Sequence, residues 1–154
     1  MSPLICAFLL GAVAGLRTMT APAAVAWGAG LGYLALVGTW ADAFTRPLVR
    51  YVLLALMLGE LVADKLPFTP NRTKAGPFAG RVVSGALCGA ALGTPAGRTA
   101  LGALLGAAGA VAGTLGGFRA RARLARAFGR DLPAALLEDA VALVGAALAV
   151  FGAR

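Results

Sequence analysis

The chain has 154 residues, of which 60% are hydrophobic and 13% are charged, and its mean hydropathy is +0.85. A soluble domain is about half apolar and about one quarter charged, so this composition argues against an ordinary soluble fold and indicates a single membrane-embedded domain over residues 1–154. The formal charge is +8, but the cations lie between apolar runs. Membrane topology and anionic lipid explain that placement, so we expect the lipid bilayer as a partner and no nucleic acid.

Six apolar segments follow one another along the chain. A helix that crosses the bilayer needs about 20 apolar residues, with about 17 as the lower limit. The third, fifth and sixth segments reach this length, whereas the first, second and fourth are short or broken, and are expected to tilt or to enter the membrane only in part. The sequence therefore predicts an all-α polytopic transmembrane bundle. The segments are Pro3–Leu16, Pro22–Gly38, Leu48–Leu66, Gly80–Gly93, Thr99–Phe118 and Leu132–Phe151.

A polar break separates the first two segments at Arg17 and Thr18, and Pro22 follows it. Proline lacks an amide donor and restricts the residue before it, which favours an interruption of the helix here. Two interpretations are open. The break is either a simple turn with one topology-setting arginine, or a broken-helix site. In the second case its free amides and hydroxyls face a ligand, and Arg17 is an anion anchor or a partner for Glu60.

The third segment carries Glu60 inside an otherwise apolar run and ends in Asp64 and Lys65. A charge at mid-membrane costs about 3 kcal/mol or more, so Glu60 is expected to have a partner or a function. Glu60 and Asp64 are four residues apart and share a helix face, where one of them is expected to stay protonated. Arg17, Arg72 or Arg81 could neutralise them. The pair suits a proton or a hard cation; the alternative is a structural ion-pair network, with Asp64 and Lys65 at the interface.

The basic stretch 119–130 leads into the last segment. It is predicted to extend the fifth helix, with arginine stems reaching the lipid interface. Asp131 is a plausible N-cap, with Pro133 in the first turn. Glu138 and Asp139 point about 100° apart on a helix, so only one can face a given point well. Glu138 is the better interior candidate, and Asp139 could instead pair with an arginine of the basic stretch.

Glycine is abundant, with 22 residues, and its spacing favours close helix contact, either within the bundle or across a homodimer interface. The stretch from Cys6 to Thr18 also aligns with that from Cys88 to Thr99, which suggests an inverted repeat of three-segment halves, 1–75 and 79–154. The glycines that follow the G-x-x-x-G pattern are Gly11/Gly15, Gly28/Gly32, Gly85/Gly89/Gly93/Gly97, Gly102/Gly106 and Gly109/Gly113/Gly117.

Positive charge is distributed unequally between the two sides of a six-segment topology. The loops after the first, third and fifth segments carry ten Lys or Arg residues, and the opposite side carries four. The positive-inside rule then places the basic loops in the cytoplasm and both termini outside. The four are Arg46, Arg50, Arg98 and Arg154.

The stretch from Glu60 to Pro67, followed by Arg72-Thr73 and by Arg81-Val-Val-Ser-Gly-Ala-Leu, resembles a bacterial family of small integral membrane proteins, domain of unknown function 4126. The late Glu138-Asp139-Ala-Val-Ala-Leu helix is similar as well, and the resemblance runs from Gly11 to Leu148. At the first break the family has Asn-Pro, where this chain has Arg17-Thr18. The resemblance implies a multi-pass protein of the bacterial inner membrane and points to Glu60, Asp64, Lys65, Arg81, Glu138 and Asp139.

No catalytic signature is present, and the chain has no histidine, which removes the commonest metal ligand and general base. Cys6 and Cys88 lie in separate apolar runs and are expected to pack as small residues. We therefore expect no enzyme and no cofactor. The intramembrane carboxylates and arginines favour transport or conduction of an ion or small solute. The alternative is a non-transporting scaffold or lipid-binding protein whose charges are structural.

Overall fold

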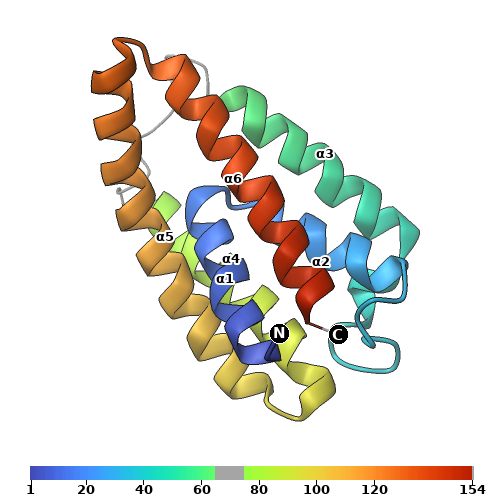
Figure 1. Cartoon of the computed structure of the whole chain (residues 1–154). Coiled ribbons are helices and arrows are strands. Elements are labelled where there is room, and N and C mark those ends of the chain that lie inside the picture. The colour runs from blue at the N-terminus through green and yellow to red at the C-terminus, as the bar shows by residue number, and fades with distance from the viewer. Residues whose placement is uncertain (65–74, 154) are drawn as a thin grey trace.

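The computed structural model describes residues 1–64 and 75–153, and within these ranges every regular element is a helix (Figure 1). Lys65 and Arg72, both candidate site residues, lie outside the described residues. The helices are α1 (Pro3–Leu16), α2 (Thr20–Gly30), α3 (Pro47–Ala63), α4 (Ala75–Gly93), α5 (Thr99–Phe128) and α6 (Asp131–Gly152), with short 3₁₀ turns at η1 (Asp42–Thr45) and η2 (Thr94–Ala96).

Three described helical stretches are long and apolar enough to cross a membrane: Ala75–Ala96, Thr99–Phe128 and Asp131–Gly152. The prediction was right for the fifth and sixth segments. It was wrong for the fourth, because the helix begins at Ala75 rather than Gly80. Pro77 lies in its first turn, where a missing amide donor leaves no hydrogen bond broken. The third segment was also predicted to be long enough, but α3 has 17 helical residues and is not among these three stretches, which have 22, 30 and 22. The last two residues of the predicted segment lie outside the described residues.

α1 and α2 form a short helical hairpin that turns at Arg17, Thr18 and Met19. The Met1 ammonium donates to the carbonyl of Gly152 at the end of α6, and Arg17 bonds Asp139 in the third turn of that helix. The chain then runs back along α6 as α2, and Val150 near the C-terminal end of α6 fills the space beside Gly28. With 14 and 11 residues, α1 and α2 are only about 21 and 17 Å long, shorter than a hydrocarbon core of about 30 Å.

The second segment ends earlier than predicted, since α2 stops at Gly30 and turns replace helix up to η1. Gly32 and Gly38 have positive φ values of 79° and 74°, a conformation that glycine adopts readily and that a helix excludes. The expected helix-contact pair Gly28/Gly32 is therefore wrong in its second member. Gly97 also has a positive φ, of 67°, and ends the glycine series of α4 outside the helix.

The remaining glycines bring α1, α4 and α5 into backbone contact. A Cβ added to Gly11 or Gly85 would overlap the backbone of Gly106, and one added to Gly89 would overlap the carbonyl of Gly102. Close approach of this kind increases van der Waals contact between helices. The glycine pattern therefore acts inside the bundle, and the buried Cys6 and Cys88 pack there as free thiols, as predicted.

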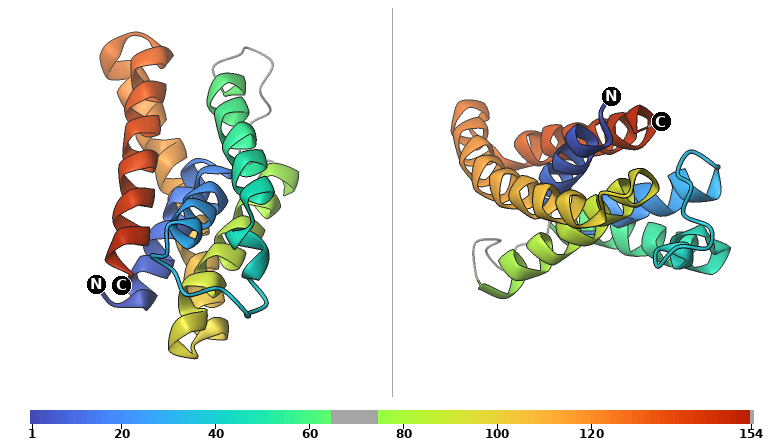
Figure 2. Two further views of the ribbon diagram at one scale, coloured as in Figure 1. Left: turned by 90° about the vertical axis from the view of Figure 1, so that its right-hand side faces the viewer. Right: turned by 90° about the horizontal axis from the view of Figure 1, so that it is seen from below.

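α5 and α6 form a long antiparallel hairpin whose turn lies at the opposite end of the molecule from both termini (Figure 1). The basic stretch continues α5 to Phe128, as predicted, and Gly129 ends the helix with a φ of 66°. α3 lies at the edge of the bundle in both views of Figure 2, and none of its residues is buried. The last residues of α3 approach the turn between α1 and α2, which brings Glu60 and Asp64 to that turn and its Arg17.

Candidate functional site

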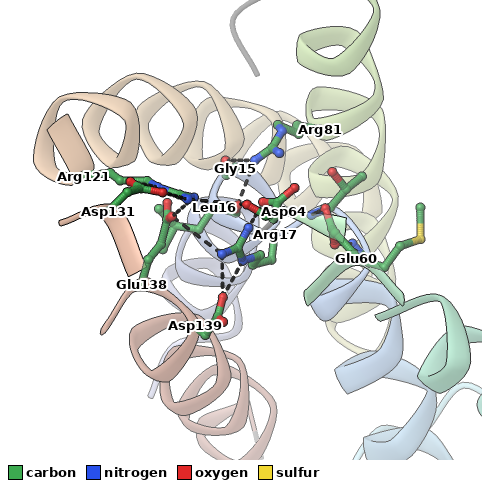
Figure 3. Close-up of polar contacts among 12 residues, drawn as sticks. Gly15, Leu16, Arg17, Glu60, Asp64, Arg81, Arg121, Asp131, Glu138 and Asp139 are labelled. Carbon is green, nitrogen blue, oxygen red and sulfur yellow. Dashed lines mark hydrogen bonds and ion pairs between the residues drawn. The ribbon is translucent and has the colours of Figure 1, made fainter. Parts of the chain in front are cut away.

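Arg17 is the centre of a group of charged side chains at the turn of the α1–α2 hairpin (Figure 3). It caps the C-terminus of α1, and its side chain is 0% exposed. Its Nε donates to Asp139 Oδ1 at 2.7 Å and its Nη2 lies 2.5 Å from the same oxygen, while Nη1 pairs with Asp64 Oδ2. Glu138 Oε2 lies 3.8 Å from Nη2. One buried guanidinium is thus shared by carboxylates from α6 and from the end of α3.

Glu60 binds the other side of the same turn. The backbone amides of Thr18 and Met19 donate to its Oε1 and Oε2, each at 2.7 Å. These amides precede the first turn of α2, where donors lack partners within the helix and the helix dipole is positive. Glu60 therefore caps α2 as a side chain from a different helix, and its charge is balanced by backbone dipoles rather than by an arginine.

Arg81, from α4, binds the C-terminal end of α1, as Glu60 binds the N-terminal end of α2. Its Nη1 donates to the carbonyls of Gly15 at 2.6 Å and Leu16 at 2.8 Å. Ser84 Oγ donates to the carbonyl of Thr18 at 2.7 Å. These carbonyls end a helix and have no helical partners, and the helix dipole is negative there, so a cation is favoured. Side chains of α3 and α4 therefore bond the backbone groups that have no helical partner at this turn.

Arg121 connects this inner group to the end of the α5–α6 hairpin. Its Nε and Nη2 bond the two oxygens of Asp131 at 3.0 and 2.6 Å, and its Nη1 bonds Glu138 Oε2 at 3.3 Å. Exposure falls along this line, from 61% at Asp131 through 15% at Arg121 and 7% at Glu138 to 0% at Arg17. A continuous row of charges therefore leads from the surface to the buried arginine.

We call these residues the hairpin-tip cluster. The chain has six Asp and Glu residues, and five of them belong to it; the sixth is Asp42 in η1. Among the described residues, the cluster brings five carboxylates together with three arginines. Its members are Arg17, Glu60, Asp64, Arg81, Arg121, Asp131, Glu138 and Asp139.

The structure brings together most of the residues that the sequence singled out, although several pairings differ. Arg17, one of the three arginines considered for the carboxylate pair, bonds Asp64, but Glu60 binds the amides of Thr18 and Met19 instead of an arginine. The Asp64 side chain is only 10% exposed, because α3 ends against Arg17. An ion pair with a buried guanidinium offsets the loss of water there.

The expectations for α6 need three corrections. Asp131 is the first helical residue and Arg130 the N-cap, since the Asp131 carboxylate is held by Arg121 and does not cap the helix. Glu138 and Asp139 were expected to compete for one interior position, but both are buried and both reach Arg17. Asp139 makes the shorter contact, and Glu138 is the residue that pairs with the basic stretch.

From the sequence, Arg121 was predicted only as one of several arginines that reach the lipid interface. Its contacts with Asp131 and Glu138 were missed. A signal was present, because the buried face of α5 advances by three or four residues through Gly102, Gly106, Ala110, Thr114 and Gly117. The next position on that face is 121. Ser84 was also missed, and it follows Arg81 by three residues on the buried face of α4.

No protein-family model, curated protein or solved structure matches this chain.

Proposed function

We propose that this membrane protein moves a small cation across the bilayer through the hairpin-tip cluster, and that the cation is a proton. The observation that supports the proposal is the row of charges that ends at a fully buried arginine. Ionisable groups placed at membrane depth are rare and commonly line ion or proton pathways, and short, interrupted helices are frequent at transporter sites.

The chemistry of the cluster favours a proton over a larger ion. Arg17 already occupies the space between Asp64 and Asp139. A metal ion would have to displace that guanidinium, whereas a proton needs only one carboxylate oxygen. We choose Glu138 as the exchange group because it lies between the partly exposed Arg121 and the buried Arg17, at 3.3 and 3.8 Å.

The test is proton flux into proteoliposomes that contain a pH-sensitive dye and a potassium diffusion potential. Glu138→Gln should lose most of the flux, because the amide cannot carry a proton as a carboxylic acid does. Asp42→Asn is the matched control, since it neutralises the one acidic residue outside the cluster. Flux that is no faster than in protein-free vesicles, or full flux in Glu138→Gln with intact folding, contradicts the proposal.

A second candidate function is a non-transporting scaffold. It is favoured by the way Glu60 and Arg81 satisfy the backbone groups of the hairpin turn, which is what a purely structural network requires. A scaffold conducts nothing, so the same flux assay separates the two functions. The multi-pass bacterial inner-membrane location, the homodimer and the inverted repeat belong to the proposal with either function.

A further inference from the structure

A second feature of the molecule lies outside the hairpin-tip cluster: a pocket between α2, α3 and α6. Its volume is about 220 Å³. Thr20 lies at one end of its α2 wall and Leu31 at the other, and Leu54 and Met57 of α3 face Leu143 to Phe151 of α6 across it. Apart from Thr20 and the indole nitrogen of Trp27, the walls are hydrocarbon, so the pocket suits an apolar occupant better than a chain of water molecules.

An arginine stacked on aromatic rings lies beside the pocket, in contact with the wall residue Trp27. The Arg50 guanidinium lies 5.1 Å from the centre of the Trp27 ring and 5.8 Å from that of Tyr51. Trp27 also forms part of the pocket wall. Tryptophan, tyrosine and arginine gather where lipid headgroups meet the acyl chains. The Arg50 end is therefore placed to meet a headgroup, and the walls beyond it to meet a chain.

Two buried donors at this end have no hydrogen-bond partner within residues 1–64 and 75–153: Trp27 Nε1 and Arg50 Nε. Arg50 also passes beside Gly30 at the C-terminus of α2, where the helix dipole favours a cation. That attraction leaves the hydrogen-bonding capacity of the Nε unused. Buried donors are usually satisfied, and an unsatisfied one is costly, so both atoms indicate an absent acceptor.

We propose that this pocket binds one acyl chain of an anionic phospholipid, with the phosphate at Arg50 and an ester carbonyl at Trp27. An acyl chain matches the apolar walls, and the headgroup supplies the acceptors and the negative charge that the two donors lack. The site is separate from the hairpin-tip cluster, so it does not depend on the proposed transport activity.

Tryptophan fluorescence tests this directly, because the chain has only two tryptophans. Trp40→Phe leaves Trp27 as the sole reporter. Phospholipids with brominated acyl chains quench tryptophan on contact. Brominated phosphatidylglycerol, mixed with unlabelled phosphatidylcholine, should half-quench Trp27 at about a fivefold lower mole fraction than brominated phosphatidylcholine does, the effect of roughly one favourable charge contact.

Three variants in the Trp40→Phe background locate the lipid. Arg50→Gln should abolish the preference for the anionic lipid, whereas Arg46→Gln, one turn earlier in an exposed position, should preserve it. Ala147→Phe fills the pocket and should reduce quenching by both lipids. Ala140→Phe is its control, because residue 140 lies two turns earlier on the same helix face, is exposed and does not line the pocket.

Thr20→Val separates a hydrocarbon occupant from a polar one. The two side chains have nearly the same shape, and a hydrocarbon chain accepts no hydrogen bond from the Thr20 hydroxyl, so quenching should not change. Loss of quenching in Thr20→Val would overturn the assignment to an acyl chain. Equal quenching by both lipids, unaffected by Arg50→Gln and Ala147→Phe, would show that Trp27 meets only bulk lipid. Stronger quenching by a free brominated fatty acid would overturn the assignment to a phospholipid.

Discussion

The Arg17 guanidinium pairs with carboxylates from two other helices, α6 and the end of α3. Arg17 itself lies in the turn between α1 and α2. A buried charge of this kind is costly to transfer from water, and the ion pairs only offset that cost. Its main effect is therefore on specificity: Asp139 and Asp64 each fix where the hairpin turn must lie. Removal of Arg17 takes a shared buried countercharge from Asp64 and Asp139.

Replacement of Arg17 by glutamine should destabilise the protein strongly. Asp64 and Asp139 would keep their charges without the shared guanidinium, and loss of one partner of a buried pair typically costs about 3–5 kcal/mol. Thermal unfolding in detergent measures the effect. Arg98→Gln is the control, since Arg98 is an exposed N-cap residue of α5 and should change stability by less than about 0.5 kcal/mol. Equal effects of the two substitutions would contradict this account of Arg17.

At the scale of elements, the glycine-lined contact between α1, α4 and α5 determines how closely these helices approach. Gly106 lies at the centre of it, with Gly85 and Gly89 on one side and Gly11 on the other. Gly116 is on the same helix, but a Cβ there would meet no neighbouring atom within 4 Å. The two glycines thus have the same helix-forming tendency and differ in their surroundings.

Gly106→Ala should destabilise the bundle by about 1–3 kcal/mol, because the new methyl group overlaps the carbonyl of Gly85 and forces the helices apart. Gly116→Ala should be neutral or stabilising by up to about 1 kcal/mol, because alanine favours a helix more than glycine does. The melting temperatures of the two variants in detergent provide the comparison. A similar decrease in both would show that the effect is not one of packing.

Much of this level of structure can be predicted from the sequence. Hydrophobic runs predict four of the six helices well, and Arg17 and Pro22 predict the break between α1 and α2. The C-terminal end of α2 could not be predicted in the same way, because the stretch from Leu31 to Gly38 is as apolar as the helix before it. The turn at Gly32 depends on its positive φ, which composition does not reveal. The pairing of Glu60 with two backbone amides depends on where α3 packs, and no local pattern specifies it.

At the scale of the whole molecule, the charged residues divide between the two ends. The turn between α5 and α6 and the extension of α5 from Arg119 are strongly basic, and the end that carries η1 and the termini is not. From the positive-inside rule we expect the basic end to lie in the cytoplasm. If the hairpin-tip cluster carries protons as proposed, Asp131 is then its cytoplasmic opening.

Cysteine labelling can test the orientation. Cys6 and Cys88 are buried and should react little with a membrane-impermeant thiol reagent. Ala43→Cys, on the exposed η1 turn, should be labelled in intact cells, and Ala127→Cys, on the exposed end of α5, only after the membrane is opened. Ala41 is a poor probe position, since it is only 1% exposed. Labelling of position 127 alone in intact cells would mean the opposite orientation.

The contact between Arg17 and Asp139 spans 122 residues of sequence, and this has a consequence for biosynthesis. Translation at about 5–20 residues per second separates the two side chains by roughly 6–24 s. Throughout that interval the hairpin lacks its partner helix α6, and Arg17 lacks two of its three carboxylates. The nascent hairpin is therefore expected to wait at the membrane surface or within the insertion machinery. α1 can pack on α4 and α5 before then, but the pairing of Arg17 with Asp139 and Glu138 forms only when the last helix arrives.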